Sequence, residues 1–462
     1  MPDGVLGPAY RVTTVAILTL VSLIAFEALA TSTAMPVAAT ALGGVSSYGL
    51  AFASYFATSL IGVVAAGGWT DARGPRAPVL AALGLFAAGL LVAGTATAFP
   101  VLLAGRAVSG LGGGLLGVSI YVVVADVYPQ ALQPRVFGAL SAAWVLPGII
   151  GPAVAGWVTT HVSWRAVFLG VLPLAALLLP VLLPRLRSVP LQEGEDRHRI
   201  LDGRFARGVL LAAGALTIQL GVDVGGPWGW GLVPAGGVLL LVALPGLVPP
   251  GALRLRRGLP ALVAVRALFT GTFAGTEAFV PLMLVAHRGI TPALAGAVLT
   301  SGTLGWSLGS FLQGSARVRL ERVTLLSLAG AVLGLGVLGL ATTPLGSAPA
   351  WLVPLAWILA ATGMGTGMSS MNVLTLRLSP TGEEGRSSSA LQLGDALGSL
   401  LGIGVAGALF SAAHAQAAQA APYVLVWGVL GFAGLAASLV ARRVRTAVAG
   451  SRPGLDSVQS AG

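Results

Sequence analysis

A polar stretch between two long apolar runs decides the fold: Gly67-Gly68-Trp69-Thr70-Asp71-Ala72-Arg73-Gly74-Pro75-Arg76. Apolar residues dominate positions 45–68 before it and positions 78–98 after it. A bilayer core about 30 Å thick is crossed by roughly 20 apolar residues of helix. Both runs are therefore predicted to be membrane-spanning helices, joined by a tight and charged turn.

The composition extends this interpretation to the whole chain of 462 residues, of which 56% are hydrophobic and only 9% are charged, with a mean hydropathy of +0.90. Soluble domains carry about 25% charged residues, so we expect an integral membrane protein. All 26 basic residues are arginines that cluster on no soluble unit, which excludes nucleic acid as the reason for the net charge of +11. The lack of cysteine excludes disulfides, thiol catalysis and thiolate metal sites.

Apolar runs along the chain predict an all-α polytopic protein with fourteen spans, arranged as six, two and six. The expected parts are a six-helix bundle with a cytoplasmic loop (1–206), an inserted pair (207–250), a second six-helix bundle (251–446) and a disordered tail (447–462). Two halves of six spans suggest a duplicated transporter architecture with a cavity between the halves. The inserted pair is short and rich in glycine, and we expect it beside the bundle, facing lipid.

The arginines predict the orientation, because cytoplasmic loops collect basic residues near span ends. With fourteen spans, 23 of the 26 arginines fall at one set of ends, and only Arg165 and Arg288 fall at the other. Both termini are therefore predicted to be cytoplasmic. The first span is not expected to be a cleaved signal peptide, because it exceeds the apolar region of about 7–15 residues in such peptides and carries Glu27.

The polar stretch quoted above resembles the loop 2–3 signature of the major facilitator superfamily. The resemblance implies two six-helix bundles and a glycine turn that brings Asp71 against another helix to gate the cytoplasmic side. Asp126, at the cytoplasmic end of span 4, is expected to join Arg73 or Arg76 in this gate. The alternative is a positively charged loop with a chance aspartate. The corresponding loop over 314–322 in the second half keeps the arginines but lacks the aspartate. The matching positions are Gly67, Asp71, Arg73, Gly74 and Arg76.

Two further stretches are similar to the fourteen-helix drug:proton antiporter branch of that family. Span 5 carries most of its Gly-Pro motif, in which a proline among small residues lets a helix pack tightly and seal one side. Any glycine-rich membrane helix packs in this way, which is the alternative. Span 1 places Glu27 nine positions before Pro36, the spacing of an acid in those antiporters. The matching positions in span 5 are Gly138, Gly151, Pro152 and Gly156.

Charged side chains within spans are the candidates for proton coupling. Burial disfavours the charged form of a carboxyl group, so such an acid can bind and release one proton in each cycle. Glu27 and Glu277 fit this role best, whereas Asp395 equally suits a structural pair with an arginine. Arg106, in span 4, resembles an arginine that the family associates with proton coupling, with snorkelling to a surface as the alternative. Asp223 is expected to be a solvated acid near the outer interface.

Aromatic, methionine and hydroxyl side chains near the expected cavity would suit varied lipophilic ligands, because polarizable side chains adapt to different shapes. Packing or lipid contact is the alternative for each of them. The four histidines lack metal-ligand spacing, so we expect no metal site and no catalytic site. The candidate cavity residues are Phe26, Thr31, Trp144, Phe279, Trp306 and Met368.

These features predict a proton-coupled secondary transporter of the inner (plasma) membrane that exports lipophilic small molecules, cations among them, by alternating access. We expect it to need no cofactor, to draw on the proton gradient, to contact membrane lipid and to work as a monomer. Export of a lipid or an endogenous metabolite, and proton symport, stay open as alternatives. A membrane enzyme would need a catalytic cluster, and an ATP-driven pump would need a G-x4-G-K-[ST] loop, which this lysine-free chain lacks.

Overall fold

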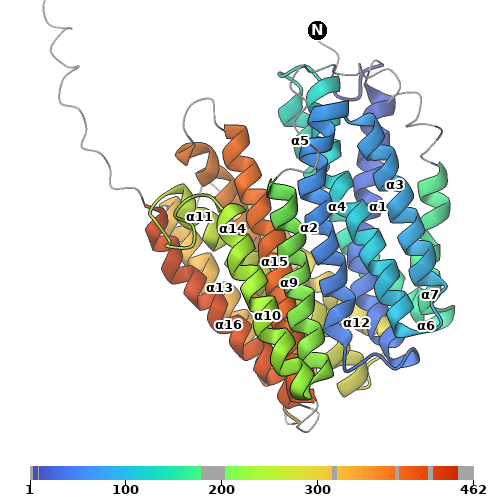
Figure 1. Cartoon of the computed structure of the whole chain (residues 1–462). Helices are drawn as coiled ribbons and strands as arrows, with labels where there is room; N and C mark the ends of the chain where they lie inside the picture. Colours follow the sequence, from blue (N-terminus) through green and yellow to red (C-terminus); the bar gives the residue numbers. More distant parts are fainter. Residues whose placement is uncertain are drawn as a thin grey trace, which may run out of the picture.

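The computed structural model describes residues 4–8, 10–177, 180, 203–314, 320–346, 348–379, 384–414 and 420–445. Figure 1 shows long helices that run side by side. No strand occurs among the described residues, which confirms the predicted all-α class. The predicted tail (447–462) and most of the loop at 184–206 lie outside the described residues.

The first half of the chain is a bundle in which one predicted span is broken. The sequence predicts a single helix over 133–158, but the structure has two, because Pro147 has no N–H to bond the carbonyl of Ala143. The Ser22 hydroxyl donates to that carbonyl instead, at 3.0 Å. The helices are α1 (Arg11–Ala41), α2 (Tyr48–Arg73), α3 (Arg76–Gly94), α4 (Phe99–Val127), α5 (Gln133–Ala142), α6 (Val145–His161) and α7 (Trp164–Leu169).

The second half repeats this plan with a π-helical turn after its first helix. That turn, η2 (Met283–His287), continues the first helix toward the loop before the second. Large side chains such as Trp357 and Trp427 are fully buried between its helices. The helices are α11 (Leu259–Leu282), α12 (Pro292–Gly314), α13 (Arg322–Thr342), α14 (Leu352–Leu378), α15 (Glu384–His414), α16 (Ala421–Ala441) and the 3-10 turn η3 (Arg442–Val444).

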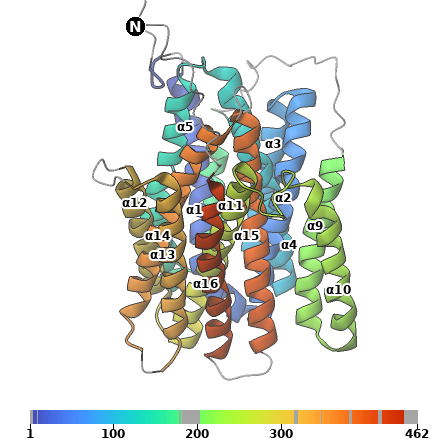
Figure 2. The same ribbon diagram turned by 90° about the vertical axis from the view of Figure 1, so that its left-hand side faces the viewer.

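The inserted pair forms a hairpin of α9 (Gly203–Val224) and α10 (Gly226–Ala243), followed by the short helix η1 (Leu244–Gly246). Helix α9 packs against α2 of the first half and α15 of the second, and α10 covers α9 at the edge of the bundle (Figure 2). The predicted lipid-facing position therefore describes α10, whereas α9 contacts both halves. The expectation of a solvated Asp223 is wrong, because both its carboxylate oxygens are buried, beside the hydroxyls of Ser47 and Ser411.

Twelve helices of the described chain are long and apolar enough to cross a membrane, two fewer than the sequence predicts. The helix from Trp164 to Leu177 is too short to qualify. Helix α12 has 23 residues but carries many Gly, Ser and Thr side chains. Two of its hydroxyls, from Thr300 and Thr303, donate to backbone carbonyls of α6. The polar side chains of α12 thus contact the other half of the protein. A count of apolar residues alone does not identify such a helix as a span.

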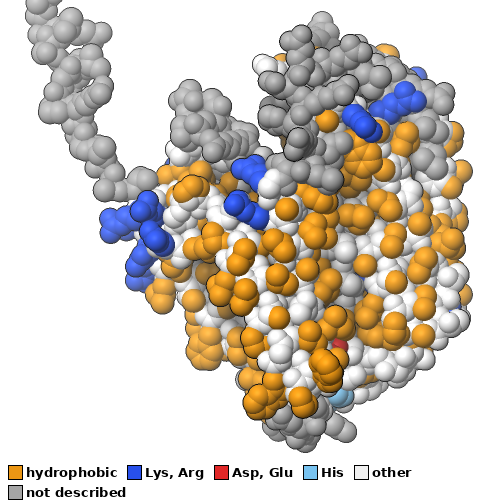
Figure 3. All heavy atoms as spheres, viewed as in Figure 1, with side chains coloured by type: hydrophobic (Ala, Val, Ile, Leu, Met, Phe, Trp, Pro, Cys, Tyr) orange, Lys and Arg blue, Asp and Glu red, His pale blue; other side chains and the backbone are white. Residues whose placement is uncertain are grey.

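The two halves meet at one end of the bundle. We call the end that holds Arg73, Arg135 and Arg442 the arginine-rich end, and Figure 3 shows basic side chains gathered there above a mostly apolar surface. At the opposite end, the Tyr48 hydroxyl of α2 donates to the Ala278 carbonyl of α11 at 3.0 Å. Nearby, the Ser411 hydroxyl donates to the carbonyl of Ser46 at 2.8 Å. These contacts close the bundle at the end away from the arginines.

Candidate functional site

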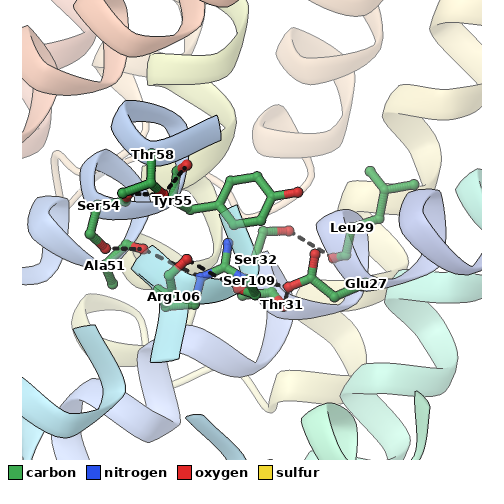
Figure 4. Close-up of polar contacts among 10 residues, drawn as sticks. All are labelled: Glu27, Leu29, Thr31, Ser32, Ala51, Ser54, Tyr55, Thr58, Arg106 and Ser109. Atoms are coloured by element: carbon green, nitrogen blue, oxygen red, sulfur yellow. Dashed lines mark hydrogen bonds and ion pairs between the residues drawn. The ribbon is translucent and has the colours of Figure 1, made fainter. Parts of the chain in front are cut away.

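A buried ion pair joins α1 to α4 near the middle of the first half. Glu27 is the seventeenth residue of the 31-residue helix α1, and its side chain is 1% exposed. The Arg106 guanidinium forms an ion pair and a hydrogen bond with Glu27 Oε1 (Figure 4), and its side chain is 3% exposed. Removing two charges from water costs several kcal/mol per ion (order of magnitude) unless geometry and further hydrogen bonds compensate. Each buried charge is therefore stabilised by the other, and removal of either one would leave its partner without a counter-charge.

The surroundings of the pair hold Arg106 on one side and leave part of Glu27 free. Arg106 Nε donates to the carbonyl of Ala51 at 3.4 Å, and the guanidinium carbon lies 4.3 Å from the centroid of the Tyr55 ring. The Thr31 hydroxyl donates to Glu27 Oε1 at 3.0 Å. Glu27 Oε2 is buried and has no hydrogen-bond partner in the described part of the chain. One carboxylate oxygen of Glu27 is therefore paired with Arg106 and Thr31, and the other has no partner among the described residues.

The second half contains a different pair, between Arg266 of α11 and Asp395 of α15. The two groups meet through two parallel hydrogen bonds, and the one from Arg266 Nη2 to Asp395 Oδ2 is 2.5 Å long. Arg266 Nη1 also donates to the Asn372 side chain at 3.3 Å. Arg266 is one of the 23 arginines that the sequence places at the ends of spans, and that prediction misses this role. Its position seven residues after Leu259, inside an apolar helix, was the available signal.

Glu277 lies on α11 beside the closed end of the bundle. The next residue, Ala278, accepts the hydrogen bond from Tyr48, and the next but one, Phe279, packs against the Tyr48 ring with centroids 5.4 Å apart. The Glu277 side chain forms no hydrogen bond or ion pair within the described residues. An unpaired carboxyl group thus sits next to a contact between the two halves.

The predicted gate residues lie apart in this conformation. Gly74 takes a φ of 69°, which favours glycine and ends α2 in the predicted tight turn. Asp71, Arg73 and Asp126 are exposed and Arg76 is half-buried. No ion pair links any of them to another residue of the described chain. Gly67 lies in α2 with open space beside its Cα atom. The gate stays a prediction.

The glycine-proline stretch of span 5 lies against the second half. A side chain on Gly156 would approach the Cα atom of Ala293 in α12 to 2.8 Å, and the Pro152 carbonyl lies against Gly296 of the same helix. Gly151 packs against the ring of Phe26, which belongs to α1. Gly138 lies on α5, and a Cβ atom added there would have no neighbour within 4 Å. Three of the four motif residues thus serve close packing, Gly151 against α1 and Pro152 and Gly156 against α12.

The candidate cavity residues do not form one group. Phe26, Trp306 and Met368 are half-buried and Trp144 is 46% exposed. Phe279 is fully buried between Tyr48 and Phe410 in the closed end. Thr31 is 1% exposed and bonded to Glu27. In this conformation the structure brings together Thr31 with the ion pair, and it leaves the aromatic set dispersed.

A model of the family described as the Major Facilitator Superfamily matches residues 15–403. The chain belongs to this superfamily. The curated relatives that it matches are named as transporters and not as enzymes. Transporters of this superfamily use an ion gradient and need no cofactor.

Curated relatives of the superfamily match over different lengths. The chain is 33% identical over 43% of its length to the acurin A biosynthesis cluster MFS-type transporter of Aspergillus aculeatus, of which the match covers 36%. It is 26% identical over 85% of its length to MFS transporter L2 of Phoma sp., covering 68% of that protein. Multidrug resistance protein 3 of Bacillus subtilis is 23% identical over 73% of the chain and 67% of that relative. The chain thus spans about a third of the first relatives it matches.

Solved structures of the superfamily show the same fold at low identity. The D-xylose-proton symporter superposes with a TM-score of 0.65 at 16% identity, over 93% of this chain and 97% of that one. The human organic anion transporter MFSD10 gives a TM-score of 0.60 at 15% identity, over 94% of this chain and 100% of that one.

Asp395→Asn tests whether the second pair of this superfamily member is structural. We expect the free energy of unfolding to fall by about 1.5–3 kcal/mol, the usual contribution of hydrogen bonds to charged groups. Substrate-driven proton movement should be retained. Thermal unfolding in detergent and proton flux in liposomes measure the two effects. Loss of flux with unchanged thermal stability would contradict this and make Asp395 a proton carrier.

Proposed function

We propose that the chain is a proton-coupled antiporter that exports lipophilic small molecules, including cations, across the plasma membrane. The buried pair of Glu27 and Arg106 carries this proposal. A proton taken by Glu27 neutralises the acid and leaves the Arg106 cation without its counter-charge, so protonation must change the contacts of Arg106. The 23% identity to a multidrug resistance protein supports this substrate class. The glycine-proline stretch of α6 supports antiport through its resemblance to that branch.

The proposed orientation puts both termini and the arginine-rich end in the cytoplasm, following the bias of arginine toward cytoplasmic loops. In this orientation α12 and the helix from Trp164 to Leu177 complete fourteen spans, and the bundle is closed toward the outside. We propose that the protein works as a monomer, because one chain contains the proton site, the gate residues and the closing contacts. Asp71, Arg73, Asp126 and their neighbours then face the cytoplasm, where we propose that they form ion pairs in the conformation that opens outward.

Helix α2 provides a route from the proton site to the closed end. Arg106 contacts the Ala51 carbonyl and the Tyr55 ring of α2, and Tyr48 of the same helix bonds Ala278 of the second half. When Glu27 takes a proton, its attraction for Arg106 falls and Arg106 keeps only its contacts with α2. In the proposed cycle this change shifts α2 and alters the closing contact of Tyr48.

Proton flux into liposomes tests the proposal. Purified protein is reconstituted with an imposed pH gradient and an internal pH dye, and a panel of lipophilic cations is added. We expect substrate-dependent proton movement in the wild type and none in Glu27→Gln, since an amide cannot exchange the proton. Glu321→Gln is the matched control, because Glu321 is 56% exposed and pairs with Arg445 at the surface.

The outcomes separate the alternatives. Flux that survives in Glu27→Gln but vanishes in Glu277→Gln would move the proton to Glu277. Substrate and protons that move in the same direction would show symport, and no flux with any compound would end the multidrug proposal. In the last case, an acyl lipid or a metabolite extracted with the pure protein would be tested next as the substrate.

A further inference from the structure

A deep apolar groove lies on the second half, away from the ion pair of the first. It has a volume of about 510 Å³, within the range of about 300–1,000 Å³ for small-molecule sites. Helices α11, α15 and α16 form its floor and sides, and the segment at 244–255 that returns from the inserted pair forms a further wall. Its lining carries no charged side chain and one hydroxyl, that of Thr272.

The groove exists because small residues bring α11 and α15 together without filling the space beside them. Gly398 and Gly402 of α15 lie directly against the backbone of Ala267 and Gly271 of α11. Ala433 of α16, which also lines the groove, adds only a methyl group. Large apolar side chains at the edge are open to the surroundings, with Val405 45% and Val429 41% exposed. A lipophilic occupant can therefore enter from the membrane.

Arginines surround the groove where it approaches the arginine-rich end. In the wall segment, Leu253 and Leu255 line the groove and alternate with the exposed side chains of Arg254 and Arg256, with Arg257 next in the chain. The turn η3, which follows α16, contributes the exposed Arg442 and Arg443, two and three residues after the lining residue Val440. The amide of Gly258 donates to the carbonyl of Arg443 at 3.1 Å, which ties the two segments together. Neither 244–259 nor 424–445 contains an acidic residue.

We propose that this groove binds an anionic phospholipid, with an acyl chain in the groove and the phosphate among Arg254, Arg256 and Arg257. An apolar lining gives no hydrogen bonds to a polar ligand, so an acyl chain suits it. Arginine binds phosphate through paired N–H groups, and basic pockets between spans on the cytoplasmic side bind anionic headgroups. The inserted pair acquires a role here, since its return segment supplies both the wall and the cations.

The groove also lies close to the second ion pair. Gly394 and Val263 line the groove, and Gly394 directly precedes Asp395 while Val263 is three residues before Arg266. A bound acyl chain therefore packs against the same two helices that the Arg266–Asp395 pair joins. Lipid binding is expected to stabilise the second half as well as to occupy its surface.

Thermal unfolding with added lipid tests the proposal. The full chain in detergent is titrated with phosphatidylglycerol or, for comparison, zwitterionic phosphatidylcholine. We expect phosphatidylglycerol alone to raise the Tm of the wild type. The triple variant Arg254→Gln, Arg256→Gln, Arg257→Gln is expected to bind it about 100-fold more weakly, at about fivefold for each basic residue. The control triple variant changes Arg11, Arg135 and Arg377, which are exposed at the same end away from the groove, to Gln.

A second variant tests the groove without changing charge. Ala433→Trp fills it and should remove the Tm shift with all arginines present. Ala436→Trp, on the exposed face of the same helix and outside the lining, should keep the shift. The proposal would be overturned if phosphatidylcholine raised the Tm equally, or if the triple arginine variant or Ala433→Trp bound phosphatidylglycerol as well as the wild type does. Displacement of the lipid by a transported cation would also overturn it. A dimer that forms through this face would do the same.

Discussion

Arg106→Ala is expected to abolish proton-coupled transport and to lower the free energy of unfolding by about 3–5 kcal/mol. The substitution leaves Glu27 1% exposed with no cation beside it, and Thr31 as its remaining partner. A buried carboxylate without a counter-charge is far less stable than the pair. Thermal unfolding in detergent and proton flux in liposomes measure the two losses in the same preparation.

The double variant Glu27→Gln, Arg106→Gln provides the control for this result. Replacing both members of a buried pair by uncharged groups removes the unpaired charge, so most of the stability should return while transport stays absent. Arg106→Lys should recover little transport, because a lysine cannot bond Glu27 and the Ala51 carbonyl with one planar group. A stable and active Arg106→Ala protein would show that the pair has neither role.

The sequence was a reliable guide to what each segment is, and a poor guide to which segments meet. Glu27 and Arg106 stand out because each interrupts an apolar run, yet they are 79 positions apart and nothing local predicts that they pair. Asp395 was expected to have an arginine partner as one of two roles, but the partner, Arg266, is 129 positions away. Such pairs depend on helix packing, which the apolar pattern of a single span does not encode.

Local rules account for the differences in the helices. The break between α5 and α6 follows from Pro147 and could have been predicted, since proline removes the hydrogen bond to the residue four positions earlier. The position of α9 against both halves could not, because its apolar sequence suits lipid and protein contact equally. The distance of Asp223 from the start of its span predicts a position near the outer interface, exposed to solvent. Its carboxylate is buried instead because α9 packs against α2 and α15, which lie elsewhere in the chain.

Gly156→Leu is expected to prevent closure of the end away from the arginines and so to abolish transport in a folded protein. A Cβ atom at this position already approaches the Ala293 backbone of α12 to 2.8 Å, so a leucine side chain forces α6 and α12 apart. The chain has no native cysteine, which allows a single reporter. Ser54→Cys, buried on α2 beyond the closed end, should react with an impermeant maleimide about tenfold faster in the Gly156→Leu background, a shift of about 1.4 kcal/mol toward the open form.

Gly138→Leu is the matched control, because Gly138 belongs to the same sequence motif but has open space around it. We expect it to keep both transport and the slow labelling of the closed form. Equal labelling of the Gly156→Leu and Gly138→Leu proteins would show that contact between α6 and α12 does not set the conformation. The glycine-proline stretch would then be a packing feature of α6 alone, and closure would depend on the Tyr48 and Ser411 hydrogen bonds instead.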